Sequence, residues 1–494
     1  MPNSTFYILH STLRKVFIIV ILLVVLMHIS SCDKATSPKT GSIAGKVLLI
    51  DDTQGTEQTY SDLSGIVVAV YHKTIVDTSL IRINAEYPGI GCGITEFTEF
   101  DHREHSPIRI TQTDTEGAYS VESLPPGYYN CVFIKENWSL RYALNITVLG
   151  GKEPSIVNGT LYPIIELSGH INDNALFKEN HHYVFSETTN IMAPVILEDG
   201  ALLSLQPQAT INFYNSVTAT GAIDMKRGWM ITSSSGLYEY GADLIDSLEK
   251  ANNVTFHASM PSFSHGKASW LNGGLCFKGS LTKINNIRFI NNVESIVMRQ
   301  SDILIEKITI TDNIFTAISG ISNLPMTLNK SVIIGADTAI EPLTTGSYHI
   351  FDNYFLNNGI AITSQYSYGE IRHNNFEQNK QDIKLLYDAV GISENNFYHS
   401  RILTISQYRR TSPVHANNFY VTDGYFFNIR GSNVPYSIVD NDVDATGNYW
   451  YPNNLEQFIL DANDNDSYPN QPCPHFVITE PSASRPIIGA GIRN

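Results

Sequence analysis

The chain is poor in charged residues and in cysteine. Only 16% of its 494 residues are charged, and none of its five cysteines has the spacing of a CxxC or His/Cys metal motif. The sequence also lacks a glycine-rich phosphate loop and a nucleophile elbow. Its formal net charge is −16, and the sequence has no basic cluster beyond Arg409-Arg410. We therefore expect no nucleic-acid partner, because phosphates require a basic surface.

The apolar run near the N-terminus is too short to span a bilayer comfortably. Arg14 and Lys15 precede twelve apolar residues, Val16–Met27, and this pattern predicts the core of a signal peptide. The segment ends in Ile29-Ser30-Ser31-Cys32, which resembles a bacterial lipobox.

This resemblance implies a lipid-anchored protein of the bacterial cell envelope, at the outer membrane or the cell surface. Residues 1–31 would be removed, Cys32 would carry the lipid, and residues 32–40 would form a polar tether. Acyl chains make an anchor rather than a span, so the membrane would be contacted through Cys32 alone. The alternative is an uncleaved signal anchor with an incidental cysteine.

The other cysteines are Cys92, Cys131, Cys276 and Cys473. Cys92 and Cys131 fall in the same predicted domain, so the sequence allows either a disulfide, which an oxidising compartment would permit, or two free thiols. We expect Cys276 and Cys473 to be free.

A unit of 21–23 residues recurs down the C-terminal half of the chain. Each copy ends in an apolar anchor, and the anchors are Phe289, Ile310, Ile333, Phe355, Phe376, Phe397 and Phe419. A fixed period of this size indicates a stacked solenoid, and it is too short for a helix pair. Because the segments between anchors are β-branched and aromatic runs broken by Gly, Asn and Ser, we predict an all-β chain with a right-handed parallel β-helix.

An asparagine stands two residues before each of the later anchors. These asparagines are Asn353, Asn374, Asn395 and Asn417, and Asn448 has the same place before Trp450. Side-chain amides stacked in one turn can bond to each other along the axis. We therefore predict a structural asparagine ladder inside one corner of the β-helix.

Residues 41–165 carry the turn and strand motifs of a small β domain. The motifs are Gly41–Val47, Ser64–Val70, Thr113–Val121 and Leu124–Tyr129. Together they resemble the carboxypeptidase regulatory-like domain, a transthyretin-like β-sandwich. The resemblance implies a spacer or binding module and supplies no catalytic residues. The chain departs from this family in an insertion at residues 72–108.

The insertion contains Asp101, His102, Glu104 and His105, which together raise the question of a metal site. Metal ligands need fixed spacing on a rigid element. We expect a solvated loop here instead.

Both ends of the β-helix, predicted at residues 166–452, have recognisable sequences. Val195–Phe213 resembles a first coil, and Asp444–Trp450 resembles the closing coil of many bacterial β-helix proteins of the pectate-lyase-like superfamily. Residues 453–494 would then cap the last coil, whose open edge would otherwise template aggregation. The Asp461–Asp466 stretch could hold Ca²⁺, but we favour a plain acidic loop and expect no cofactor.

Irregular repeat lengths predict protruding loops. Phe256 and Phe289 are 33 residues apart, so residues 257–274 are expected to leave the coil. Trp229–Glu249 is the second candidate loop. Such loops often build the binding face of a solenoid.

Three tyrosines also follow the repeat. Tyr366, Tyr387 and Tyr408 each lie eleven residues after an anchor, so we expect them to stack in one column about 4.8 Å apart. An aromatic strip of this kind suits sugar rings. The charged neighbours expected beside the column are Lys384, Asp388 and Arg409. The alternative is a stack that only stabilises a turn.

The coils also carry scattered charged residues, including Glu370, Arg372, His373, Glu394 and His415. They do not form the paired carboxyls of a hydrolase or the base-and-cation set of a uronate lyase. The leading hypothesis is an envelope lipoprotein whose β-helix binds polysaccharide without cleaving it. The alternatives are a polysaccharide lyase or glycoside hydrolase, and a structural or adhesive surface protein.

Overall fold

The structure is a computed structural model of the whole chain. The residues that it describes are 39–73, 78–92, 100, 102, 105–173, 175–198, 201–205, 210–213, 217–219, 222–224, 229–233, 254–258, 262–264, 274–278, 282–285, 288–290, 295–299, 302–313, 315–321, 325–342, 346–365, 367–386, 389–398, 403–406, 413–420, 426–428, 442–451, 455–461 and 476–493. Among them, no helix is both long and apolar enough to cross a membrane.

Two sheets form the N-terminal part of the chain. One contains β1 (Gly41–Asp51), β2 (Gln58–Thr59), β5 (Ala118–Leu124), β8 (Ser155–Ile156) and β9 (Gly159–Leu161). The other has the order β4 (Arg109–Gln112), β3 (Val67–His72), β6 (Gly127–Ile134), β7 (Arg141–Val148). Their shared core includes Ile43, Val121, Val68, Phe133 and Val148, all at most 4% exposed.

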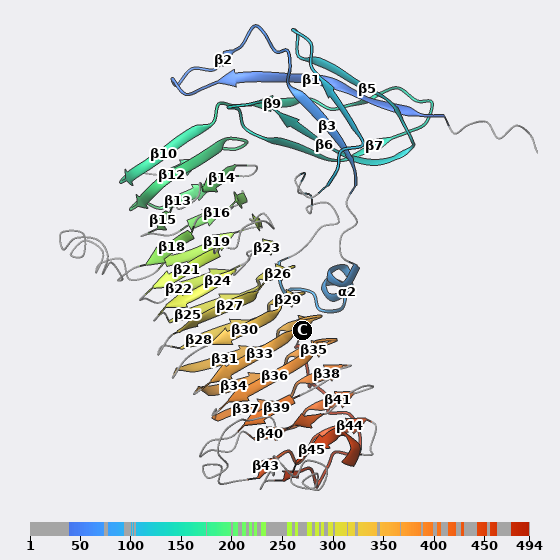
Figure 1. The fold of residues 1–494 in the computed structure, drawn as a ribbon, viewed down its shortest axis with the longest axis vertical. Coiled ribbons are helices and arrows are strands. Elements are labelled where there is room, and N and C mark those ends of the chain that lie inside the picture. Colours follow the sequence, from blue (N-terminus) through green and yellow to red (C-terminus); the bar gives the residue numbers. More distant parts are fainter. Residues whose placement is uncertain are drawn as a thin grey trace, which may run out of the picture.

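The remainder is a parallel β-helix with three faces, which lies below the N-terminal sheets in Figure 1. The first face is an 11-stranded sheet of β11 (Ala175–Phe177), β13 (Val195–Leu197), β16 (Val217–Ala219), β19 (Val254–Ala258), β22 (Thr282–Asn285), β25 (Ile303–Glu306), β28 (Met326–Asn329), β31 (Ser347–Phe351), β34 (Tyr368–Arg372), β37 (Ala389–Ser393) and β40 (Val414–His415).

The second and third faces together form a 24-stranded sheet. The second face consists of short strands: β12 (His182–Ile191, which spans both faces), β14 (Leu202–Leu205), β17 (Ala222–Asp224), β20 (Ser262–Ser264), β23 (Arg288–Ile290), β26 (Thr309–Thr311), β29 (Val332–Ile334), β32 (Tyr354–Leu356), β35 (Asn375–Glu377), β38 (Asn396–Tyr398), β41 (Asn418–Tyr420) and β44 (Tyr449–Tyr451). The third face consists of β10 (Ile165–Ile171, which like β12 spans both faces), β15 (Thr210–Phe213), β18 (Trp229–Ser233), β21 (Gly274–Lys278), β24 (Ile296–Arg299), β27 (Thr316–Ile321), β30 (Thr338–Pro342), β33 (Ile360–Gln365), β36 (Gln381–Leu386), β39 (Leu403–Ser406), β42 (Phe427–Asn428) and β45 (Ile459–Leu460).

The predicted all-β chain with a parallel β-helix is confirmed, and the apolar anchors lie inside it. Phe355, Phe376, Phe397 and Phe419 pair in register from coil to coil. Their ring centroids are 5.1, 4.8 and 4.7 Å apart, with interplanar angles of 13° or less. Trp450 stacks on Phe419 at 4.4 Å and continues the column. The repeat therefore produces a continuous apolar core because each coil places its anchor directly over the previous one.

A left-handed residue turns each coil into its short strand. Asp352, His373, Glu394 and Ala416 all have φ between 54° and 57°. This conformation is uncommon outside glycine. Each of these residues directly precedes a ladder asparagine, whose hydrogen bonds hold the corner in place.

The ladder asparagines form one hydrogen-bonded column. Nδ2 of Asn353 donates to Oδ1 of Asn374, and the same 3.0 Å bond joins each asparagine to the next through Asn395 and Asn417 to Asn448. Each Oδ1 from Asn374 onward also accepts the backbone N–H of the preceding asparagine, at 2.8–2.9 Å. All of these side chains are fully buried, so the column satisfies the polar atoms of the corner without water.

The insertion in the N-terminal sheets contains a helix, which the sequence did not predict. Helix α2 (Thr78–Glu86) buries Leu80 and Ile83 against an apolar patch on the second face. That patch consists of Val332, Ile334, Tyr354 and Leu356. Near the insertion's other described residues, Nδ1 of His102 lies 2.7 Å from Oη of Tyr142, and the ring of His105 stacks on Phe100. Asp101 and Glu104 lie outside the described residues.

No disulfide joins Cys92 to Cys131. The reason is the position of the insertion. Cys131 lies in the N-terminal core, whereas the insertion carries Cys92 to the β-helix, where its N–H donates to Oγ1 of Thr309 at 2.9 Å.

The C-terminal segment does more than cap the last coil. Strand β46 (Val477–Ile478) pairs with β43 (Val443–Asp444), and a 3₁₀ turn at Glu456–Phe458 precedes β45. The chain then runs back along the second face to Asp352, as the terminus beside β35 in Figure 1 shows. We call residues 487–493 the returning tail. The tail therefore reaches further along the β-helix than a cap of the last coil would require.

The predicted loop at residues 257–274 also needs correction. Phe256 lies on the first face in register with Ile284, and it is Phe263 that pairs with the anchor Phe289. Residues 257–274 accordingly contain strand β20. Of the second candidate loop, Trp229–Glu249, the structure describes Trp229–Ser233, which forms β18, and residues 234–249 lie outside the described residues. Phe256 therefore belongs to a different apolar column from Phe289, and the 33 residues between them do not measure an excursion from one coil.

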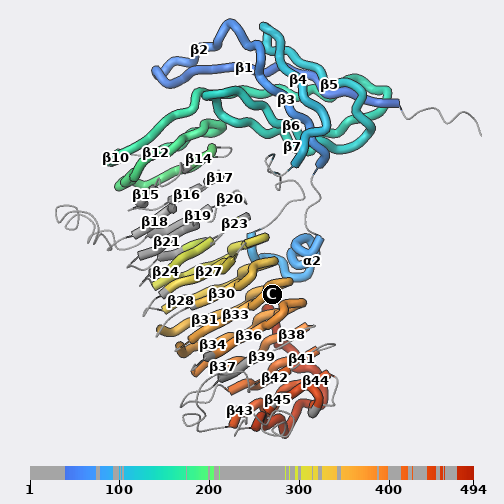
Figure 2. Tube along the Cα trace, in the orientation of Figure 1, coloured from blue at the N-terminus to red at the C-terminus, as the bar shows by residue number. Residues whose placement is uncertain are grey.

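Figure 2 shows the same path as a tube, with the insertion helix beside the middle coils.

Candidate functional site

Most of the residues predicted to bind ligand lie outside the described part of the chain. These are Tyr366, Tyr387, Asp388, Tyr408 and Arg409, and the lipidation residue Cys32 lies outside it too. Lys384 is described. It lies half-buried on β36, between Thr363 and Thr404 of the neighbouring strands.

A different tyrosine column is described, and it shows what in-register stacking does to aromatic rings. Tyr398 and Tyr420 stack with centroids 5.2 Å apart and planes 7° apart. The two rings lie face against face, so the face of each ring that meets the other is closed to a ligand. Burial raises the pKa of Tyr398 to about 12, so its hydroxyl remains a hydrogen-bond donor. Such a column suits hydrogen bonding better than the stacking of a sugar ring.

An exposed tyrosine, Tyr368, lies on the first face of the β-helix instead. Tyr368 begins β34, and its side chain is 53% exposed. Its neighbours in register are Ser347 on β31 and Ala389 on β37. Within the described part of the chain it makes no ring contact. Because both neighbours are short, a flat ligand can reach the ring of Tyr368.

Two charged side chains follow Tyr368 along the same face of the strand. Glu370 and Arg372 alternate with the buried Ile371, and both are exposed. The in-register neighbours of Glu370 are His349 and Gly391. Alternate residues of a strand point to the same side and stand roughly 6.6 Å apart. We call Tyr368, Glu370 and Arg372 the β34 row.

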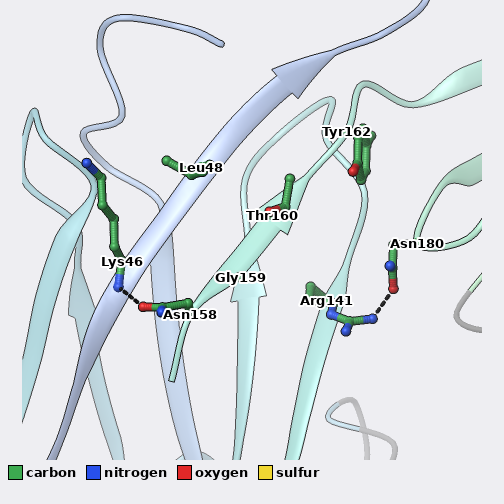
Figure 3. A pocket seen from close by; sticks show the side chains of 8 residues that line it. All are labelled: Lys46, Leu48, Arg141, Asn158, Gly159, Thr160, Tyr162 and Asn180. Carbon is green, nitrogen blue, oxygen red and sulfur yellow. Dashed lines mark hydrogen bonds between the residues drawn. The ribbon is translucent and has the colours of Figure 1, made fainter. Parts of the chain in front are cut away.

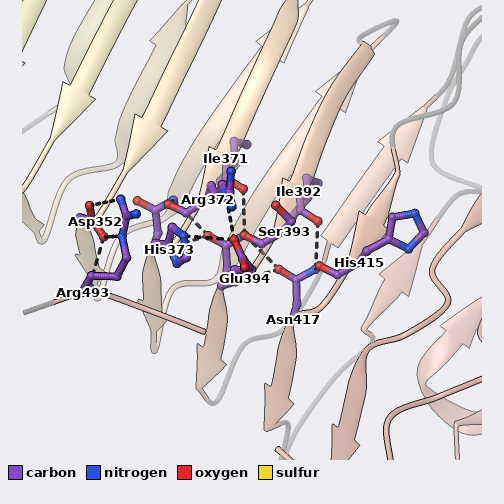
Figure 4. A network of polar contacts seen from close by, with 12 residues as sticks. Asp352, Ile371, Arg372, His373, Ile392, Ser393, Glu394, His415, Asn417 and Arg493 are labelled. Carbon is purple, nitrogen blue, oxygen red and sulfur yellow. Dashed lines mark hydrogen bonds and ion pairs between the residues drawn. The ribbon is translucent and has the colours of Figure 1, made fainter. Parts of the chain in front are cut away.

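The β34 row continues into a polar network at the corner of the coil, drawn in Figure 4. Nε of Arg372 donates to Oε2 of Glu394 at 2.5 Å, and Nε2 of His373 lies 3.1 Å from the same oxygen. Figure 4 shows Arg372 and His373 of one coil converging on Glu394 of the next coil. The arrangement holds the Glu394 carboxylate between two nitrogen donors and fixes the Arg372 side chain at the end of the row.

His373 is held as a neutral, buried ring. Its side chain is 7% exposed, and its Nδ1 has no hydrogen-bond partner among the described residues. Burial, with a smaller effect of the Arg493 charge, lowers the pKa of His373 below its ordinary value. With the proton on Nε2 facing Glu394, the Nδ1 lone pair is shielded from solvent. In this arrangement His373 positions Glu394 and has no path to act as a general base.

The returning tail closes the near side of this network. Arg493 forms a bidentate pair with Asp352, with Nε to Oδ1 at 3.0 Å and Nη2 to Oδ2 at 2.7 Å. Towards the other end, Nδ1 of His415 lies 2.9 Å from the carbonyl oxygen of Thr446. The carboxylates of Asp352 and Glu394 therefore already have cationic or imidazole partners, and Glu370 is the exposed carboxylate of the row.

The β34 row combines three kinds of side chain. It offers an aromatic face, a hydrogen-bond acceptor and a guanidinium donor in sequence. Across the described residues, no group of three or more His, Cys, Asp or Glu side chains is arranged to hold a metal ion. The stretch Ala462–Asp466, where Ca²⁺ was considered, lies outside them, and Asp461 accepts a hydrogen bond from the N–H of Val477 at 2.9 Å.

Sequence reasoning found the charged members of this region but not their grouping. Arg372, His373 and Glu394 were treated as separate surface positions, and the structure brings them into contact. Tyr368 was missed altogether. Its signal was present in the repeat, because the residues one coil away on either side, Ser347 and Ala389, are both small.

No family model, curated protein or solved structure matches this chain.

Proposed function

We propose that the protein is a non-catalytic polysaccharide-binding lipoprotein of the bacterial cell envelope, and that the β34 row is its binding site. The observation that carries the proposal is the exposed ring of Tyr368, set between two short side chains and followed on the same strand by Glu370 and Arg372. Sugars are bound by aromatic faces combined with nearby polar groups.

Each side chain of the β34 row would contact a different group of the bound sugar. A pyranose ring stacked on Tyr368 would place its hydroxyls toward Glu370, which accepts hydrogen bonds. Arg372 is held by Glu394, so less conformational entropy is lost when it donates to the next sugar. The parallel strands on both sides of β34 extend the surface along the β-helix axis, which suits a polymer.

The envelope location is supported by the sequence of the N-terminus. The apolar core and Ile29-Ser30-Ser31-Cys32 favour lipidation of Cys32, which would anchor the chain without spanning the membrane. The N-terminal sheets would then stand between the anchor and the β-helix. This order would hold the β34 row away from the bilayer, where a surface polymer can reach it.

The test is a polysaccharide panel applied to soluble protein that begins at Asp33. We expect Tyr368→Ala to weaken binding of the recognised polymer about tenfold, which corresponds to the loss of one aromatic contact. Glu370→Gln should weaken it further when combined with Tyr368→Ala. Tyr128→Ala is the matched control, because Tyr128 is 55% exposed on β6 of the N-terminal sheets.

Each bound polymer is then assayed for new reducing ends and for unsaturated products. Binding that is equal in wild type and Tyr368→Ala would refute the site. Cleavage would refute the non-catalytic proposal and establish a hydrolase or lyase. An absence of binding to every polymer would favour a structural or adhesive role.

A further inference from the structure

A cavity lies where the N-terminal sheets meet the first coils of the β-helix. Its volume is about 360 Å³, and Figure 3 shows the side chains that line it. They are Lys46, Leu48, Arg141, Asn158, Gly159, Thr160, Tyr162 and Asn180. Ligand cavities in proteins begin at about 300 Å³, so this one is large enough for a single sugar or a molecule of similar size.

Positive charge dominates the lining. Lys46 and Arg141 both line the cavity, and no acidic side chain does. Within the described part of the chain, the Arg141 guanidinium donates one hydrogen bond, to Oδ1 of Asn180. Neither cation forms an ion pair with a described residue. Two cations left without a counter-ion are notable in a chain whose net charge is −16.

Acidic residues do lie near the tyrosine end of the cavity, and one of them, Asp52, is already paired. Burial raises the pKa of Tyr162, and Glu57, Asp52 and Glu179 add to the effect. Asp52 is bound by Nζ of Lys178 at 2.7 Å and by Nε2 of His181 at 3.0 Å. The Tyr162 hydroxyl therefore remains protonated as a donor, while the charge of Asp52 is satisfied outside the cavity.

We propose that this cavity binds a sugar-sized molecule that carries a carboxylate or a phosphate group. The Arg141 guanidinium supplies a planar fork that matches either oxyanion, and Lys46 supplies a second positive charge. Asn158, Thr160 and Asn180 provide amides and a hydroxyl for the polar remainder of the ligand. The site is separate from the β34 row and does not depend on the function proposed for it.

The position of the cavity implies a second effect of the ligand. Lys46 and Asn158 belong to the N-terminal sheets and their connection, whereas Asn180 belongs to the turn that precedes β12 of the β-helix. A ligand that contacts both sides would be bound by the native interface and not by the separated parts. Binding should therefore raise the melting temperature of the protein.

The experiment titrates soluble protein beginning at Asp33 with galacturonate, glucose 6-phosphate and glucose, and measures heat and melting temperature. We expect one or both anions to bind and to stabilise the protein, and glucose to bind at least about tenfold more weakly. Galacturonate alone would identify a carboxylate site, and glucose 6-phosphate alone would identify a phosphate site.

Variants locate the binding. Arg141→Gln and Lys46→Gln should each weaken anion binding at least about tenfold. Arg109→Gln is the control, since Arg109 is exposed on β4 and donates to the Ile108 carbonyl oxygen. Lys46 is exposed, so its variant remains informative if Arg141→Gln unfolds. The proposal is overturned if neither anion binds, if glucose binds as tightly, or if both variants bind like wild type.

Discussion

Arg82 on α2 forms an ion pair with Glu377 on β35, with Nη2 and Oε2 2.7 Å apart, although 295 residues separate them in the chain. Nη1 of Arg82 also donates to Oη of Tyr354 at 3.3 Å. The pair is partly exposed, with 44% of the Arg82 side chain accessible. It therefore orients the helix, while the apolar contacts beneath it contribute most of the stability.

Replacing Ile83 with alanine should detach α2 from the β-helix. Ile83 is fully buried against the apolar patch, and removing a buried isoleucine side chain of this kind costs about 2–5 kcal/mol. Hydrogen–deuterium exchange should show faster exchange in Thr78–Glu86. Ile81→Ala is the matched control, because Ile81 is on the same helix and is 40% exposed. Equal protection in the two variants would contradict this account of the docking.

Replacing Gly491 with alanine should release the returning tail. Gly491 has φ +86°, and a Cβ there would lie 2.2 Å from Nδ2 of Asn396 and 2.5 Å from Oδ1 of Asn375. Gly489 has nearly the same φ, +88°, but a Cβ there would meet no atom within 4 Å. Both variants carry the same backbone penalty, so their difference isolates the clash.

Digestion with a carboxypeptidase measures this difference. The tail of Gly491→Ala should be removed much faster than that of Gly489→Ala, whose tail should resemble wild type more closely. Identical digestion rates would show that the tail is not seated on Asn375 and Asn396.

Replacing Asn395 with alanine should destabilise the β-helix strongly. Oδ1 of Asn395 accepts from the N–H and Nδ2 of Asn374, and its Nδ2 donates to the carbonyl oxygens of Ile371 and Ser393 and to Oδ1 of Asn417. Each buried group left unsatisfied costs about 1–3 kcal/mol. We expect urea denaturation to show a loss of about 3 kcal/mol or more.

The exposed Asn172 has no described hydrogen bond, and Asn172→Ala is the control. A loss no larger than that of the control would mean that the ladder is not needed for stability.

Stability should fall as the pH drops below neutrality, through His373. Burial lowers the pKa of His373 in the folded state, so its neutral form is favoured there. This contribution is present above the unfolded pKa, about 6.5, and is lost as the pH falls through that value toward the lower folded pKa. Thermal melts from about pH 8 to about pH 5 should show a steeper loss in wild type than in His373→Asn.

Asparagine is chosen because it tolerates the left-handed backbone at this position, where φ is 57°. Parallel pH profiles for the two proteins would show that His373 carries no proton-linked stability.

The repeat could be predicted from the sequence because its apolar anchors recur at a regular spacing along the chain, and this spacing can be read without knowing any long-range contact. The docked insertion could not, because Leu80 and Ile83 match their apolar partners on β29 and β32 only once the coils have formed. The asparagine pairs show the same limit. The first residue of Asn395-Asn396 was assigned to the ladder, but nothing nearby in sequence indicates that Nδ2 of Asn396 donates to the Ala490 carbonyl oxygen.

The candidate site was predictable only in part, for a geometric reason. Alternation along β34 places Glu370 and Arg372 on one side of the strand, and this can be read from the sequence. The contact between His373 and Glu394 depends on two left-handed corners lying in register. That register is set by the whole stack of coils and by no single segment.

The returning tail and α2 change how this solenoid should unfold. In a simple repeat protein each coil contacts only its neighbours, so stability is a sum of nearest-neighbour terms and the ends can fray one coil at a time. Here Ile492 packs beside α2, and the tail also bonds to Asn418. The coils between Thr309 and Asn418 are thus joined by contacts that skip repeats. They should melt as one block, with fraying confined to the coils outside it.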